Sequence, residues 1–203
     1  ILSLHAKWII GHMTEHFLPD ELFDEILDMF KAEDNKLFFD ESSLRYMHSM
    51  TLRTLEESEL HLLIHCQALW DFAVDGNLDF YDHMLHLSLP QRKQYFDHLL
   101  YIFDHSENLK FKLVKEPMIL DFKYQINQCV FLSDQFSYLR LNTYNWNNNL
   151  AIMNHPNLRC MFDRFFQSAW CDEDKDLLTS HDEIHSFLVH IIQQINILDE
   201  IQL

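Results

Sequence analysis

The feature that most constrains this fold is the stretch from Leu109 to Thr143, in which apolar and polar residues alternate. Successive side chains of a β-strand point to opposite faces of the sheet, so a period of two is typical of a strand with one buried face. The apolar series is Leu109, Phe111, Leu113, Met118, Leu120, Phe122, Tyr124 and Ile126. We therefore predict a small antiparallel sheet over about residues 109–143, at the centre of the fold.

Helix signals lie on both sides of this stretch. Proline fits a first helical turn and carboxylates stabilise a helix N-terminus, so Pro19 and the acidic residues after it predict a helix to about residue 33. An apolar i, i+3, i+4 pattern predicts another over residues 158–169. Capping-box spacing, in which Ser or Thr precedes Glu or Gln by three residues, predicts further helix starts. These pairs are Ser88 with Gln91 and Ser180 with Glu183.

The segment from Thr54 to Asp75 carries the most complete helix signature. Thr54 and Glu57 have capping-box spacing, and Gly76 stands where a left-handed C-cap residue belongs. A shorter helix is expected over residues 78–87. The expected fold class is therefore α+β and helix-rich, with about six helices around the central antiparallel sheet.

The first thirteen residues suggest a fusion. Gly11-His12-Met13 reads like a cloning scar, with Met13 as the natural initiator. On this interpretation residues 1–10 are a fused peptide ligand or a tag-derived segment, residues 11–13 are the scar, and residues 14–203 form a single globular adaptor domain. Apolar residues recur at helical spacing in this peptide, so Ile1, Leu4, Lys7 and Trp8 are predicted to contact a groove. The alternative is an ordinary first helix of the domain.

Charge and hydropathy exclude several classes of protein. The net charge of -17 would repel a phosphate backbone, so we expect no nucleic-acid binding. No apolar run approaches the length of a membrane span, which argues against membrane insertion. The four cysteines form no CxxC pair and mostly have apolar neighbours, which favours buried free thiols in a reducing compartment. A cytoplasmic location is therefore expected.

No catalytic motif stands out. With glycine only at Gly11 and Gly76, the chain has no Gly-rich phosphate loop or nucleophile elbow, and we expect no enzyme activity and no cofactor. His61 and His65, one turn apart on the predicted helix, are the candidate metal ligands of the alternative hypothesis, a His-rich metal-binding helical enzyme or sensor. Arg92 and His98 also fit the loose Arg-His spacing of helical ribonuclease domains.

The sequence TEHFLPDELFDEILDMF and the acidic, Asn- and Phe-rich body after it resemble the LvgA-like adaptor subunits of the Dot/Icm type IVB secretion coupling complex. The resemblance is one of size and character across residues 13–203. It implies a secretion chaperone that recognises effector segments, binds the IcmS–IcmW pair and docks on the DotL tail, in the cytoplasm or at the inner-membrane face. The leading hypothesis is therefore a non-enzymatic acidic adaptor that binds amphipathic segments of partner or effector proteins for type IV secretion.

Overall fold

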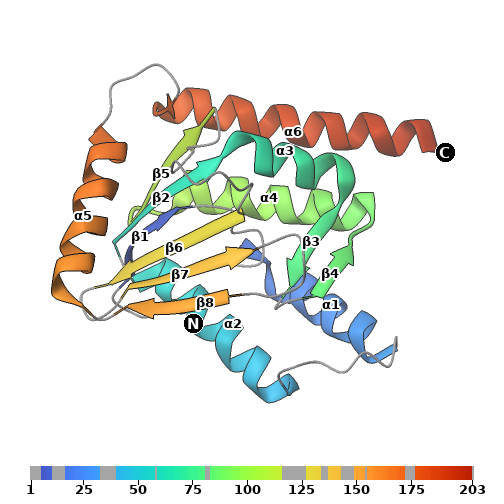
Figure 1. The fold of residues 1–203 in the computed structure, drawn as a ribbon. Helices are drawn as coiled ribbons and strands as arrows, with labels where there is room; N and C mark the ends of the chain where they lie inside the picture. The colour runs from blue at the N-terminus through green and yellow to red at the C-terminus, as the bar shows by residue number, and fades with distance from the viewer. Residues whose placement is uncertain are drawn as a thin grey trace.

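The computed structural model describes residues 6–10, 17–32, 40–57, 59–80, 83–115, 127–133, 137–142, 149–153, 155–171 and 177–202. Within these ranges the chain forms six α-helices, and the helix-rich α+β class is confirmed (Figure 1). The helices are α1 (Asp20–Ala32), α2 (Glu41–Glu57), α3 (Cys66–Asp75), α4 (Leu89–His105), α5 (Pro156–Cys171) and α6 (His181–Gln202). No helix in the described part of the chain is both long and apolar enough to cross a lipid bilayer.

The main sheet has seven strands in the order β8-β7-β6-β1-β2-β5-β9. They are β1 (Ala6–Ile10), β2 (Leu60–His65), β5 (Leu109–Val114), β6 (Asn127–Ser133), β7 (Ser137–Asn142), β8 (Asn149–Met153) and β9 (Leu177–Leu178). The expected sheet was smaller and purely antiparallel, whereas this one is mixed. Strands β1, β2 and β5 run parallel, and the remaining pairings are antiparallel.

The alternating stretch that predicted the sheet contributes three of these strands, of which only two are neighbours. β6 and β7 pair antiparallel as expected, while β5 is separated from β6 by β1 and β2. The second part of the alternating series, residues 116–126, lies outside the described residues. Local alternation therefore identified strands correctly, but the order in the sheet depends on segments far away in the chain.

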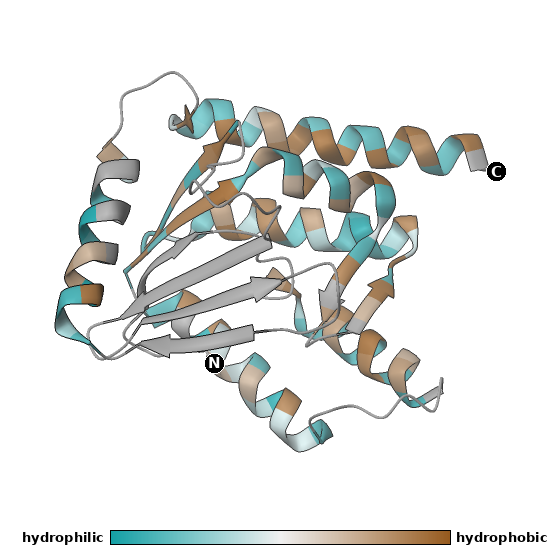
Figure 2. Cartoon of the chain, in the orientation of Figure 1, coloured by the Kyte–Doolittle hydropathy of each residue, from teal (hydrophilic) through white to brown (hydrophobic). Residues whose placement is uncertain are grey.

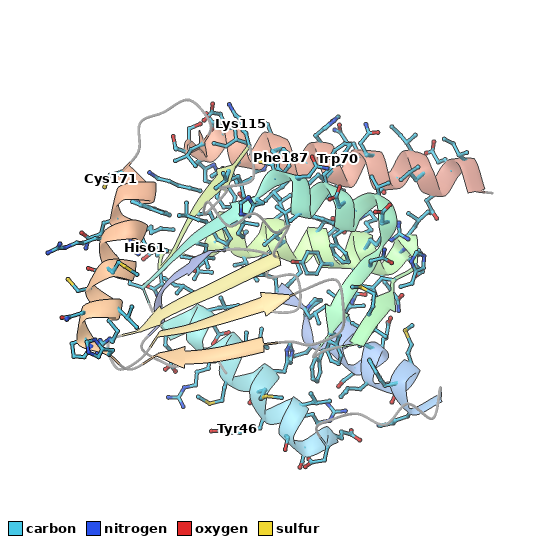
Figure 3. The ribbon with its side chains drawn as sticks, viewed as in Figure 1. Tyr46, His61, Trp70, Lys115, Cys171 and Phe187 are labelled. Atoms are coloured by element: carbon cyan, nitrogen blue, oxygen red, sulfur yellow. The ribbon has the colours of Figure 1, made fainter. Side chains whose placement is uncertain are left out.

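The two faces of β2 and β5 pack differently. Leu62 and Ile64 on β2 and Phe111 on β5 belong to the main hydrophobic core, together with the buried stripes of α1, α4 and α6. The intervening positions face α5, since the ring of His61 makes an edge contact with Trp170, at 4.8 Å between ring centroids (Figure 3). Helices thus cover both faces of the parallel strands, as parallel sheets require.

The prediction of one long helix over residues 54–75 is wrong. Helix α2 already contains Thr54 and ends at Glu57, β2 follows over Leu60–His65, and only then does α3 begin. Leu62 and Leu63 are both fully buried although they point to opposite faces. A strand buried on both faces loses its alternation and reads as an unbroken apolar run, which periodicity cannot separate from a buried helix.

The helix expected over residues 78–87 is also wrong. This segment forms the antiparallel hairpin of β3 (Asn77–Phe80) and β4 (His83–His86). In contrast, the capping boxes at Ser88 and Ser180 are confirmed, because each precedes the first residue of a helix and contacts the side chain three residues on. Gly76 is confirmed as the C-cap of α3, with a φ of 69°.

Candidate functional site

The residues predicted to contact a groove fall in or before β1. Ile1 and Leu4 lie outside the described residues, and Lys7 and Trp8 belong to β1. Residues 6–10 are an extended strand that pairs with β2 on one side and β6 on the other, so the helical conformation expected for this segment is wrong. Trp8 stands opposite His61 in the register with β2. That residues 1–10 are a fused peptide ligand or a tag-derived segment, and residues 11–13 a cloning scar, stays a prediction.

The candidate metal ligands His61 and His65 lie on β2 rather than on a helix. Residues four apart in a strand share a face but are about 13 Å apart along the chain, so they cannot ligate one ion as a helical pair could. His61 packs against Trp170, and His65 precedes the first residue of α3. The described residues contain no group of three or more His, Cys, Asp or Glu that could hold a metal ion.

The carboxyl ends of the parallel strands are the usual ligand site of such sheets. At that edge β2 leads directly into Cys66, the first residue of α3. Burial raises the pKa of the Cys66 thiol to about 11, and the weaker opposing effect of Lys115 does not offset it. The thiol is therefore protonated at neutral pH and lacks the activation that a nucleophilic cysteine needs. The other cysteines with described side chains, Cys160 and Cys171, are exposed, so their expected burial is wrong.

Arg92, one residue of the suggested ribonuclease pair, has a structural role. Its side chain is buried, and its guanidinium donates hydrogen bonds to the carbonyl oxygens of Leu87 (2.8 Å), Ala73 (3.2 Å) and Val74 (2.7 Å). The last two belong to the final turn of α3, where backbone carbonyls have no partner within the helix and the dipole favours a cation. Burial lowers the pKa of Arg92, with Asp75 opposing the change. Arg92 thus caps α3, and its Nη2 lies 3.3 Å from Nε2 of His86.

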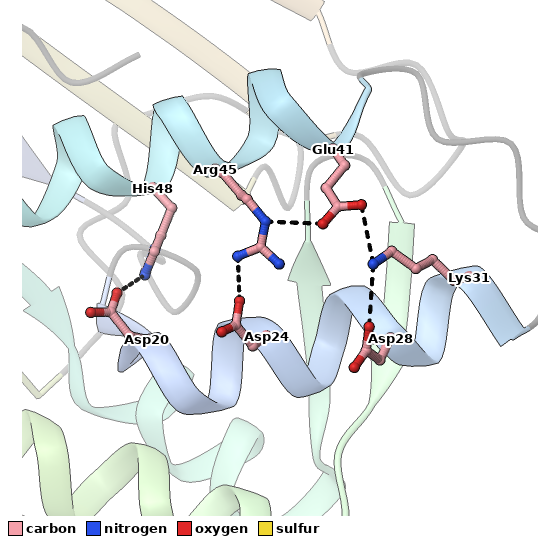
Figure 4. A network of polar contacts seen from close by, with 7 residues as sticks. All are labelled: Asp20, Asp24, Asp28, Lys31, Glu41, Arg45 and His48. Carbon is pink, nitrogen blue, oxygen red and sulfur yellow. Dashed lines mark hydrogen bonds and ion pairs between the residues drawn. The ribbon is translucent and has the colours of Figure 1, made fainter.

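A ladder of polar contacts joins α1 to α2 (Figure 4). Lys31 contacts Asp28 and Glu41, Arg45 contacts Glu41 and Asp24, and His48 contacts Asp20. Hydrogen bonds from Lys31 and Arg45 hold the pKa of Glu41 below its ordinary value. These pairs are largely exposed and screened by water, so the ladder sets the register of the two helices more than it stabilises them.

The buried end of this ladder is His48. Its ring stacks on Phe23 at 3.9 Å between ring centroids, and its Nε2 lies 3.0 Å from Oδ1 of Asp20. Burial lowers the pKa of His48, and Asp20 only partly offsets this effect. The imidazole is therefore neutral at pH 7 and acts as a packed aromatic ring. These contacts fix α1 against α2 and give the His48 ring a structural role.

A different kind of surface lies on α3 and α6. The ring of Trp70 on α3 stacks on His190 of α6, at 5.7 Å between ring centroids (Figure 3). Large apolar side chains face solvent one turn after Trp70 on α3, and two and three turns after His190 on α6. Val74 is 45% exposed, Ile197 is 47% exposed and Ile201 is 74% exposed. We call Trp70, Val74, His190, Ile197 and Ile201 the α3–α6 strip.

The α6 residues of the strip lie on a different side of the helix from its buried residues. At about 100° per residue, His190, Ile197 and Ile201 share one side of the helix, about 120° from the buried stripe that contains Ile191. Figure 2 shows apolar residues continuing along α6 towards its C-terminal end. Ile197 and Ile201, one helical turn apart in the sequence, are the signal that could have revealed this side of α6.

Exposed carboxylates lie on the two helices that form the strip. The exposed charged residues of α3 and of the last two turns of α6 are Asp71, Asp75, Asp199 and Glu200. At about 100° per residue, Asp71 lies beside Val74 and Glu200 beside Ile197, whereas Asp199 lies on the opposite side of α6. Neither helix contains Lys or Arg. The arrangement can therefore bury apolar side chains of a partner and attract positive charge around them.

Comparison of the chain with protein-family models, with curated proteins and with solved structures gives no significant match.

Proposed function

We propose that this protein is a non-enzymatic adaptor that binds segments of partner proteins on its helical surface. The observation that carries the proposal is the α3–α6 strip, where three large apolar side chains are 45–74% exposed on adjoining helices. Exposed apolar residues scattered singly are ordinary, but a contiguous group with a polar border is typical of a protein-binding surface.

The side chains at the other candidate sites have structural roles, which supports a non-enzymatic function. The Arg92 guanidinium caps α3, and the neutral His48 ring packs on Phe23. The thiol of Cys66 is held in its protonated form by burial. Arg92, His48 and Cys66 are thus held by contacts or burial within the fold, whereas Val74, Ile197 and Ile201 are exposed to solvent.

Site-specific photo-cross-linking in the cells that make the protein tests this proposal. A photoreactive phenylalanine analogue at position 197 or 201 is expected to capture the same small set of proteins. The matched control is position 161 on α5, because Met161 is also an exposed apolar helical residue, at 56%. Adducts that are identical from positions 161 and 201, or no adducts from position 201, would contradict the proposal.

The identity of the partners is a separate question. The resemblance to LvgA-like adaptors predicts that the captured proteins are secretion effectors, the IcmS–IcmW pair or the DotL tail. Mass spectrometry of the adducts distinguishes these from unrelated partners. An adaptor that captured only non-secreted proteins would retain its proposed function and lose its proposed place in type IV secretion.

A further inference from the structure

We infer that the occupant of the α3–α6 strip is a cationic amphipathic helix, with an apolar stripe flanked by Lys or Arg, which packs along α6 beyond the end of α3. This inference rests on the proposed function, because it names the partner chemistry of the same surface. It differs from that function in committing to one conformation and one sign of charge.

The lengths of the two helices leave the later α6 residues of the strip uncovered. Trp70 and His190 mark the point where the helices touch. Helix α3 ends at Asp75, five residues after Trp70, which is about 7.5 Å along its axis. Ile201 stands eleven residues after His190, or about 16.5 Å along α6. Figure 1 shows the two helices running in the same direction, with α6 continuing past α3.

A helix is the conformation that fits the strip. Helix α3 already packs on the first part of it through Trp70, and Val74 begins the uncovered part. Ile197 and Ile201 are one turn apart, which is the spacing that the apolar stripe of a second helix matches. A partner helix laid along α6 would therefore continue the contact that α3 begins, in the manner of helix-in-groove recognition.

The border charges select the sign of the partner. Asp71 lies about one turn from Val74 on α3 and Glu200 about one turn from Ile197 on α6, and no Lys or Arg of either helix offsets these carboxylates. A second copy of this chain would bring the same carboxylates against these, and each copy has a net charge of -17. Like charges across an interface oppose association, so a partner rich in Lys or Arg is favoured over self-association.

Binding of two designed peptides to the full chain, measured by fluorescence anisotropy, tests the inference. Both peptides have one leucine stripe over about four helical turns. The first carries Lys at every flanking position, and the second carries Glu there. The chain variants are Ile197→Ser with Ile201→Ser, and the control Leu158→Ser with Met161→Ser. The control pair lies on α5 at 37% and 56% exposure, so it removes comparable exposed apolar surface elsewhere.

The Lys peptide is expected to bind saturably and the Glu peptide is not. The Ile197→Ser/Ile201→Ser variant should weaken binding by about tenfold or more, as for loss of central apolar anchors, while the α5 control leaves affinity within about twofold. Raising NaCl from about 50 to about 500 mM should also weaken binding.

Several outcomes would overturn the inference. They are equal binding of both peptides, no binding of either, a loss seen only in the α5 variant, or concentration-dependent dimers that the Ile197→Ser/Ile201→Ser variant abolishes. Circular dichroism of each variant confirms that its fold is retained. The proposed function is tested independently by the cross-links from position 201, so specific adducts without Lys-peptide binding would contradict only the partner chemistry.

Discussion

Replacing Gly76 by alanine should destabilise this protein far more than an ordinary surface substitution. Gly76 has a φ of 69°, in the left-handed region that costs an alanine about 1–2 kcal/mol. A Cβ at this position would also lie 2.3 Å from Nε and Nη2 of Arg92 and 2.4 Å from its Cζ. These atoms cannot remain in place at such distances, so the guanidinium must move.

The second cost follows from what the guanidinium holds. Arg92 donates to the carbonyl oxygens of Leu87, Ala73 and Val74, and a hydrogen bond to a charged group contributes about 1.5–3 kcal/mol. Losing one or two of them adds about 3 kcal/mol to the backbone strain. We therefore expect Gly76→Ala to lower the free energy of unfolding by about 4–5 kcal/mol, a large share of the usual 5–15.

A double-mutant cycle separates the two costs. In an Arg92→Ala background the clash is absent, so Gly76→Ala should cost only about 1–2 kcal/mol. The double variant should then lose less stability than the sum of the two single losses. Urea unfolding followed by circular dichroism gives the four free energies, with an osmolyte added to all samples if one variant unfolds in buffer. Strictly additive costs, or a loss below about 1 kcal/mol for Gly76→Ala, would refute this reasoning.

Three further predictions concern titration, thiol reactivity and helix capping. Burial holds the pKa of His48 below its ordinary 6.5. The contribution of neutral His48 to stability is therefore complete above pH 6.5 and is lost as the pH falls through the folded-state pKa. Urea unfolding midpoints at about pH 7.5 and pH 5 should show this loss of stability, and His48→Gln should reduce the difference between them. Alkylation mapped by mass spectrometry at about pH 7.5 should be slow at Cys66, whose pKa is about 11, and fast at the exposed Cys171; equal rates would contradict the assigned burial. Ser180→Ala should lower the stability by about 1 kcal/mol through loss of the N-cap of α6, whereas an unchanged urea midpoint would show that the cap is dispensable.

Three of the correctly predicted helices, α1, α4 and α6, have starts that are encoded locally, whereas α5 was predicted from its apolar period. Pro19 begins α1 within one residue, and the Ser88 and Ser180 capping boxes stand immediately before α4 and α6. A cap is formed by residues three or four positions apart, so no knowledge of the rest of the fold is needed. The same holds for Gly76, whose left-handed conformation ends α3.

The errors arise where distant parts of the chain decide the structure. The Leu60–His65 segment is a strand because Leu109–Val114 pairs with it, and burial on both faces hides its period. The Ala6–Ile10 segment matches a helical spacing, but its partners are β2 and β6. The helical spacing of Ile197 and Ile201 is visible in the sequence, but their exposure could not be predicted, because it depends on where α3 ends relative to α6.

The position of β1 in the sheet has a consequence for synthesis on the ribosome. β1 precedes both of its partners in the chain, because it pairs with β2 at residues 60–65 and with β6 at residues 127–133. At about 5–20 residues per second, the β6 partner follows β1 by roughly 6–24 s. During that interval one edge of β1 has no partner, and non-local pairing of this kind is slow. The pairing of β1 with β6 therefore cannot form until residues 127–133 have emerged from the ribosome.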